Sequence, residues 1–244
     1  PAMTLSLPEG GKIVLTGRID RIDLLKINNE NYVRIIDYKS GNKDFKLSDV
    51  FYGLQLQLIL YLSAIWEKGL KGITDKVLPA GVFYFKLDEP LIRTNGKDED
   101  KDMEIEIMKK MKMRGLILAD ADIVKEMDRN INGNSFIIPA RINKDGSLGK
   151  SSSVATIEQF EMLKSYVKEA LYSISKEMSK GNISISPYKK NKHTSCKFCP
   201  YSAICRFEAN VAGNKYRILK DLSNKKAWEM LDTKPKGLGG EAID

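Results

Sequence analysis

The stretch GRIDRID at residues 17–23, followed by IIDYKSG at residues 35–41, decides the fold that this chain is expected to adopt. Both stretches read as β-strands, and the polar NNEN at residues 28–31 lies between them as a turn. We therefore predict a β-hairpin. Each strand carries a carboxylate in apolar surroundings, and the second strand places Lys39 two residues after Asp37.

Asp37 and Lys39 are predicted to share one face of the second strand, because successive side chains of a strand point to opposite faces. Val33 and Ile35 precede them on that face, so the acid and the amine end a buried apolar stripe. Charged side chains are rarely buried unless they are paired or bind a metal. Asp37 is therefore either half of a structural ion pair, with Lys39 or Arg21, or part of a functional site.

The chain has the composition of an ordinary globular protein, with 244 residues of which 42% are hydrophobic and 30% charged. No apolar run approaches the roughly 20 residues that a membrane span needs. The net charge is +8 and the pI about 9.2, which favours a nucleic acid over a membrane as partner. Ten lysines and arginines against two acids, Glu208 and Asp221, lie in residues 186–226, which we call the cysteine segment.

We predict an α/β fold with a mixed sheet flanked by helices. The core is expected to span residues 4–185. The cysteine segment is expected to pack on this core, and residues 227–244 are expected to form a flexible tail. Within the core, the patterns predict a long strand at 12–27, or a strand with a bulge after Gly17, and a buried strand at 79–87. They also predict a helix at 48–68 with Ser48 as N-cap, a helix at 104–130 broken near Gly115, and a helix at 156–181 with a capping box at Thr156.

The predicted hairpin has the residues that metal-assisted cleavage of a phosphodiester needs. Mg²⁺ prefers oxygen ligands, usually one or two carboxylates. Asp20 and Asp37 on adjacent strands could supply them, and the main-chain carbonyl of Tyr38 is a further ligand. Lys39 would orient the attacking water and neutralise charge on the phosphate.

These motifs, followed by QLILY at residues 57–61, resemble three ordered motifs of the RecB-like nucleases of the PD-(D/E)XK superfamily. The resemblance implies a restriction-endonuclease-like fold, Asp20 and Asp37 as metal ligands, and Lys39 as the catalytic lysine. It also implies that Gln57 and Tyr61, which share a helix face, belong to the active site. Asp23 matches no metal ligand of the family, and a salt bridge to a neighbouring arginine is its expected role.

The three cysteines of the chain, Cys196, Cys199 and Cys205, lie close together in the sequence. An odd, clustered set is not a disulfide framework; it indicates metal ligation in a reducing compartment, here expected to be cytoplasmic. Zinc is one reading, and His193 would complete a three-cysteine, one-histidine site. A shared iron–sulfur centre is the other.

The spacing C-x₂-C-P-Y-x₃-C, together with PAGVFYF at residues 79–85, resembles the AddB family of bacterial AddAB helicase–nucleases. The resemblance implies a 4Fe–4S cluster held by these cysteines and by a fourth that lies upstream and is not in this chain. It implies an AddA-type helicase–nuclease subunit as partner and, as substrate, single-stranded DNA delivered from an unwound duplex during repair of double-strand ends by recombination. The chain is then expected to be the nuclease region of a longer protein and a weak exonuclease when isolated.

Two further functions fit the same motifs. One is a stand-alone RecB-like exonuclease of the CRISPR-associated kind, which also combines these motifs with an iron–sulfur cluster. The other is a non-catalytic DNA-binding or scaffold domain that retains only the fold. Intact Asp20, Asp37 and Lys39 favour an enzyme over the scaffold.

Overall fold

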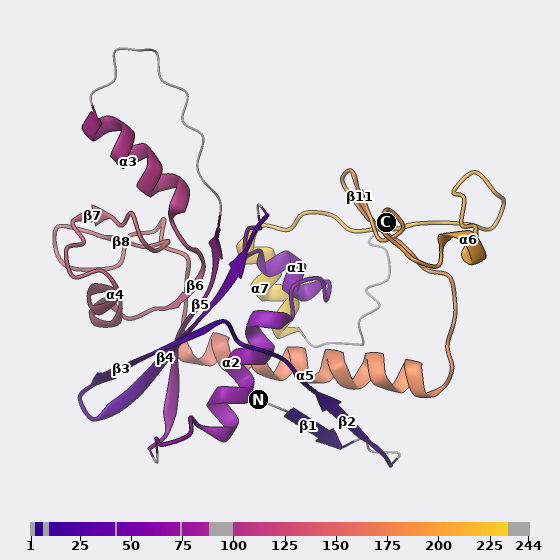
Figure 1. Cartoon of the computed structure of the whole chain (residues 1–244), viewed down its shortest axis with the longest axis horizontal. Helices are drawn as coiled ribbons and strands as arrows, with labels where there is room; N and C mark the ends of the chain where they lie inside the picture. The colour runs from indigo at the N-terminus through magenta and orange to yellow at the C-terminus, as the bar shows by residue number, and fades with distance from the viewer. Residues whose placement is uncertain (1–2, 7–9, 42, 74, 88–99, 234–244) are drawn as a thin grey trace.

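The computed structural model of the chain describes residues 3–6, 10–41, 43–73, 75–87 and 100–233 (Figure 1). A mixed sheet of five strands in the order β3-β4-β5-β6-β9 forms its centre. The strands are β3 (Arg21–Ile27), β4 (Glu30–Lys39), β5 (Val77–Lys86), β6 (Arg114–Leu118) and β9 (Val154–Ala155). The predicted α/β class with a mixed sheet is therefore confirmed.

The strand β4 is an interior strand of this sheet and lies antiparallel to the edge strand β3 and parallel to β5. The antiparallel pair is the predicted hairpin. A parallel neighbour needs a long crossover, which residues 40–76 supply through the helices α1 (Leu47–Phe51) and α2 (Gln57–Lys68). The buried run of Val33, Ile35 and Ile36 in β4 is what a strand covered on both faces requires.

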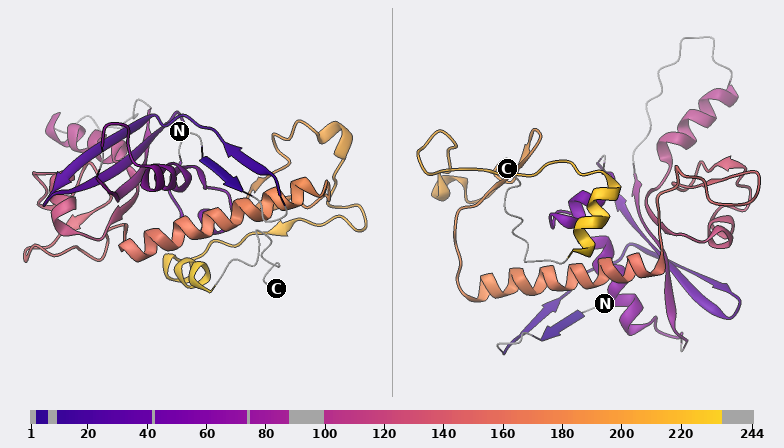
Figure 2. Two further views of the ribbon diagram at one scale, coloured as in Figure 1. Left: turned by 90° about the horizontal axis from the view of Figure 1, so that it is seen from below. Right: turned by 180° about the vertical axis from the view of Figure 1, so that it is seen from behind.

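Each face of the sheet packs on a separate apolar core. On one face, Val33, Ile35 and Val82 pack with side chains of α2 and α5 (Ile157–Ser179). On the other face, Ile36 and Phe83 pack with residues of α4 (Ala121–Met127) and of the irregular segment that holds β7 (Gly133–Asn134) and β8 (Arg141–Ile142). Both views of Figure 2 show α5 running past the sheet toward the cysteine segment.

The remaining described elements lie around this centre. They are β1 (Met3–Ser6) and β2 (Lys12–Leu15), α3 (Asp100–Met111), β10 (Tyr188–Lys190), β11 (His193–Thr194), α6 (Ser202–Cys205), β12 (Arg217–Ile218) and α7 (Asn224–Asp232). None of the helices in the described part of the chain combines the length and the apolar composition that a membrane span requires.

The predicted strand at 12–27 is two strands. β2 pairs with β1 in a separate two-stranded sheet, and β3 begins only at Arg21. A β-carbon at Gly17 would lie 2.9 Å from Cε1 of Tyr61, so the link between the strands passes close to the α2 side chain. The missing side chain at Gly17 permits this approach.

The predicted helix at 48–68 is also divided, and Ser48 lies inside α1 while Lys46 is its N-cap. The break before α2 is held by Gln55, whose side chain is buried. Its Oε1 accepts from the backbone N–H of Lys46 at 3.1 Å, and its Nε2 donates to the carbonyl of Asp44 at 2.8 Å. A buried side chain that bonds two backbone groups fixes a turn where apolar spacing alone suggested a continuous helix.

The expected single helix at 104–130 is not formed. The structure has α3, the strand β6 and α4 in this part of the chain. A β-carbon at Gly115 would lie 1.9 Å from the carbonyl oxygen of Val82, so glycine is what lets β6 pair closely with β5. Ile117 is fully buried in the second core. The glycine therefore marks a close strand contact rather than a kink in a helix.

The C-terminal tail expected to begin at residue 227 is also different in the structure, because its first residues belong to a helix. Residues 224–232 form α7, whose Ala227 and Leu231 are buried in the first core. Ser223 caps this helix by accepting from the N–H of Lys226. The chain is thus packed as far as α7, and residues 234–244 of the predicted flexible tail lie outside the described residues.

Candidate active site

The register of the hairpin brings Asp20 and Asp37 together. Arg21, the first residue of β3, pairs with Ile36, so Asp20 directly precedes the ladder at the end where β4 continues to Asp37. The carboxylate of Asp20 accepts a hydrogen bond of 3.0 Å from the backbone N–H of Tyr38. Both acids therefore flank Tyr38 at the carboxyl end of β4.

The charges of β4 meet on one face, as predicted. Asp37 is buried with 3% exposure, and Nζ of Lys39 lies 2.5 Å from its Oδ2. The ammonium also donates to Oε1 of Gln57 at 3.2 Å. A buried carboxylate is thus compensated by a lysine that reaches outward, since the Lys39 side chain is 26% exposed.

The helix α2 contributes the predicted pair Gln57 and Tyr61. Nε2 of Gln57 donates to the Tyr61 hydroxyl at 3.0 Å, while its Oε1 accepts from Lys39. This chain of hydrogen bonds fixes which way the amide points. Gln57 and Tyr61 also line a cavity of about 270 Å³, together with Gly17, whereas Asp20, Asp37 and Lys39 are not among its lining residues. We call Asp20, Asp37, Lys39, Gln57 and Tyr61 the hairpin site.

Asp23 lies apart from the hairpin site, on the other face of the hairpin, where the register sets it opposite Arg34. Its two carboxylate oxygens accept hydrogen bonds of 2.7 Å from Arg21 and Arg34. Burial alone would raise the pKa of Asp23, but these two hydrogen bonds outweigh it and leave the pKa below its ordinary value. The expected salt bridge is confirmed.

Tyr84 is a neighbour of the site that the sequence did not single out. It stands opposite Asp37 in the β4–β5 register and is 2% exposed. Its hydroxyl is buried without a hydrogen-bond partner among the described residues. Burial, and then the charge of Asp37, raise the pKa of this phenol, so it stays protonated and able to donate. Alternation along β5 could have predicted the face on which Tyr84 lies. It could not have predicted that Tyr84 pairs with Asp37 of β4.

The donors around Tyr38 fit a hard cation. Oδ2 of Asp37 is a buried oxygen that accepts no hydrogen bond from the described residues, although Lys39 balances its charge. The carboxylate of Asp20 is bound to the backbone N–H of Tyr38, and the carbonyl of Tyr38 belongs to the same strand residue. No cluster of three or more acidic, histidine or cysteine side chains suited to a metal occurs in the described ranges, so this donor set consists of two carboxylates and a carbonyl.

The cysteines are not brought together in the same way. Cys196, Cys199 and Cys205 are free and half-buried, and they do not form a three-ligand cluster in the described structure. Cys196 and Cys199 share a turn, in which the N–H of Cys199 donates to the carbonyl of Cys196, and Cys205 ends α6. Thiolates have the right chemistry for iron–sulfur ligation, but this arrangement is not a ligand set.

Comparison with known proteins gives the family of the chain. The model of a family described as the PD-(D/E)XK nuclease superfamily matches residues 2–206. The AddB subunit of an ATP-dependent helicase/deoxyribonuclease from Acetivibrio thermocellus is 51% identical over 231 residues, which are 95% of this chain and 20% of that protein.

Proteins of the same name from other bacteria are equally similar. Those of Thermoanaerobacter sp. (strain X514) and Ruminiclostridium cellulolyticum are 50% and 53% identical, over 100% and 95% of this chain and 21% and 20% of their own lengths. The chain therefore spans about a fifth of the length of the curated relatives it matches.

Proposed function

The chain belongs to the PD-(D/E)XK nuclease superfamily, and on this premise we propose that it is a Mg²⁺-dependent DNA nuclease whose catalytic residues are those of the hairpin site. The observation that carries the proposal is the ion pair of the buried Asp37 with Lys39, next to the Asp20 contact with Tyr38 and hydrogen-bonded to Gln57. A scaffold with no chemistry to perform gains little from a buried carboxylate, because removing its charge from water is costly even when a lysine pairs with it.

Asp20, Asp37 and the Tyr38 carbonyl would hold the metal ion. When bound, Mg²⁺ supplies polarisation of the scissile phosphate and a water of lowered pKa. The chain's own residues do the rest. The ammonium of Lys39 offsets the negative charge that develops on the phosphate, and Gln57 holds that ammonium in place. Tyr61 fixes Gln57 in turn, so the second helix contributes positioning. The Tyr84 hydroxyl is available to donate to a group that enters beside Asp37.

The wider role rests on the names of the relatives. Each is named as one subunit of a helicase/deoxyribonuclease, so we propose an AddA-type helicase–nuclease subunit as partner. The substrate in this proposal is a single DNA strand from an unwound duplex, cut as an exonuclease would cut it during repair of double-strand ends by recombination. The same names favour this role over that of a stand-alone exonuclease of the CRISPR-associated kind.

An iron–sulfur cluster is part of the proposal only as an expectation for the longer protein. It would use Cys196, Cys199 and Cys205 with a fourth cysteine from outside this chain. Because the three thiols are not assembled as ligands here, no catalytic step depends on the cluster.

The test is the substitution Asp37→Asn, which keeps the shape of the side chain and removes its charge. Cleavage of labelled single-stranded DNA in Mg²⁺ should fall by at least about 100-fold, as expected when a group that stabilises charge in the transition state is lost. DNA binding should persist. A variant that folds, binds DNA and cuts as fast as its parent would refute the assignment.

A further inference from the structure

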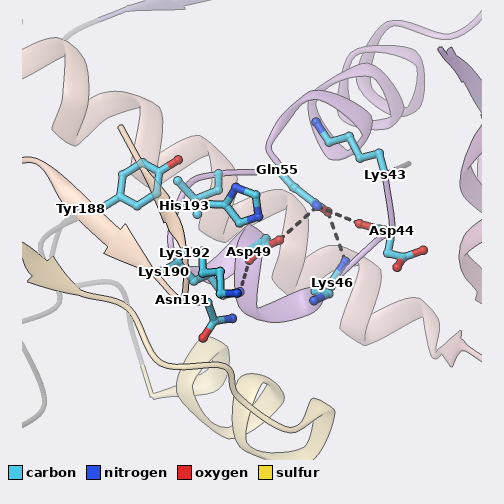
Figure 3. Close-up of a pocket in the computed structure, with 11 residues that line it drawn as sticks. Lys43, Asp44, Lys46, Asp49, Gln55, Tyr188, Lys190, Asn191, Lys192 and His193 are labelled. Atoms are coloured by element: carbon cyan, nitrogen blue, oxygen red, sulfur yellow. Dashed lines mark hydrogen bonds and ion pairs between the residues drawn. The ribbon is translucent and has the colours of Figure 1, made fainter. Parts of the chain in front are cut away.

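A second polar cavity lies beside the hairpin site and is enclosed by two segments far apart in the sequence. It has a volume of about 590 Å³. Residues 43–55, which follow β4, form one wall, and the β10–β11 hairpin at residues 188–193 forms the other (Figure 3). The cysteine segment therefore touches the nuclease core here.

The buried Lys190 fixes the second wall. Its ammonium forms ion pairs with Asp49, at the start of α1, and with Asp221 at 2.7 Å, and it donates to Ser48 at 3.3 Å. Asn191 at the hairpin tip donates to Asp221 as well, at 2.9 Å. These bonds hold the tip against α1, so the cavity is a built feature of the fold.

The lining carries an excess of positive charge once its internal pairs are counted. Asp49 is paired with Lys190, and Asp44 with Arg114. Lys43, Lys46 and Lys192 also line the cavity, and none of them forms an ion pair within the described residues. Asp37 and Asp49 act on Lys43, and Asp221 acts on Lys46, through charge interactions without a direct ion pair. Three ammonium groups that lack a direct ion pair in one cavity are suited to an anion with several oxygens.

Lys43 connects this cavity to the hairpin site. Its Nζ lies 5.2 Å from the centre of the Tyr84 ring, and Nζ of Lys39 lies 5.7 Å from the same centre. Burial, and then the charge of Lys39, lower the pKa of Lys43, so an anion placed between the two lysines would relieve their repulsion. A strand that occupies the hairpin site would bring a neighbouring phosphate to this cavity.

We propose that the cavity formed by Lys43, Lys46 and Lys192 is a subsite for a DNA phosphodiester next to the one that is cut. The inference rests on the proposed nuclease function and adds the path of the strand, from the hairpin site across α1 to the tip of the β10–β11 hairpin. Because the contacts are to phosphate, this subsite reads no sequence.

The test measures binding of a fluorescent oligothymidine by the full chain in Ca²⁺, which we use to replace Mg²⁺, at a series of salt concentrations. In the variant Lys46→Gln/Lys192→Gln the dissociation constant should rise by about tenfold. The slope of log K against log salt should become shallower by about 0.7 for each lysine that contacts a phosphate. The matched control is Lys144→Gln/Lys150→Gln, which removes the same charge from the segment around Leu148, a residue that packs on the opposite face of the sheet. It should leave the slope unchanged.

Hydrolysis of bis(p-nitrophenyl) phosphate separates this inference from the nuclease proposal, because a substrate with one phosphate cannot occupy both places. The double variant should hydrolyse it at the parental rate while losing activity on the oligonucleotide. A binding slope equal to that of the control variant would overturn the subsite. Absence of hydrolysis in the parent, with the slope change intact, would instead overturn the nuclease proposal.

Discussion

The hairpin site and the cysteine segment differ in how their functional groups are held. In the hairpin site, Asp37 is buried in β4, an interior strand of the sheet. Asp20 accepts from the backbone of the next residue of that strand, and Gln57 reaches Lys39 from α2. In the cysteine segment, each strand is only two or three residues long, and α6 has no buried residue. Phe198 and Ile204, beside the thiols, are 87% and 84% exposed.

This difference shows which of the two sites the chain assembles by itself. Sheet register fixes side chains on neighbouring strands relative to each other, so the groups of the hairpin site are held together by the fold of this chain. Turns and one short helix fix neighbouring thiols only locally, and apolar side chains around them are left uncovered. The predictions that follow test this contrast.

Of three substitutions that probe the contrast between the hairpin site and the cysteine segment, Tyr84→Phe should have the largest effect on cleavage. Removing the hydroxyl should lower the cleavage rate about tenfold, if it donates one hydrogen bond to a group bound beside Asp37. The free energy of unfolding should stay the same or increase, because a buried hydroxyl without a partner is costly. Denaturant unfolding and cleavage kinetics check the two effects separately. A loss of stability with unchanged cleavage would mean that Tyr84 serves only packing.

Asp23→Asn should affect stability and leave cleavage intact. The pKa of Asp23 is lowered in the folded chain, so its ion pairs stabilise the fold above the ordinary carboxyl pKa and cease to do so as the pH falls through the lowered value. The variant should lose about 1 kcal/mol of stability at neutral pH. The difference from the parent should shrink below about pH 4, which urea unfolding at several pH values measures. A constant difference across that range would contradict the assigned pairing.

Replacing Cys196, Cys199 and Cys205 together by serine should have the smallest effect. Because the thiols are half-exposed and not assembled as ligands, the free energy of unfolding should change by less than about 0.5 kcal/mol. Cleavage by this chain should be unchanged. The contrast between the two regions would fail if the parent bound iron stoichiometrically and the triple variant unfolded more easily.

Local patterns predicted the parts of the structure that depend on neighbouring residues. The alternation in β4 gave the shared face of Asp37 and Lys39, helical spacing gave the pairing of Gln57 with Tyr61, and the capping box at Thr156 gave the start of α5. Each of these is decided within a few residues, where period and propensity act directly.

The features that the patterns missed depend on contacts between distant segments. The split of the predicted helix at 48–68 is fixed by the buried Gln55, and β6 is fixed by the fit of Gly115 against Val82. The place of Tyr84 depends on the β4–β5 register, and the basic cavity joins Lys43 to Lys192 across the fold. A single sequence does not specify such pairings, because tertiary contacts override local preference.

The comparison of Asp20→Asn with Asp23→Asn tests the central claim most directly. The two acids lie three residues apart, and the same substitution removes the same charge from the acid beside Tyr38 and from the acid paired with Arg21 and Arg34. If the hairpin site is the nuclease centre, Asp20→Asn should lower Mg²⁺-dependent cleavage of single-stranded DNA by at least about 100-fold, while Asp23→Asn cuts at nearly the parental rate. Equal activity of the two folded variants, whether both high or both low, would contradict the account.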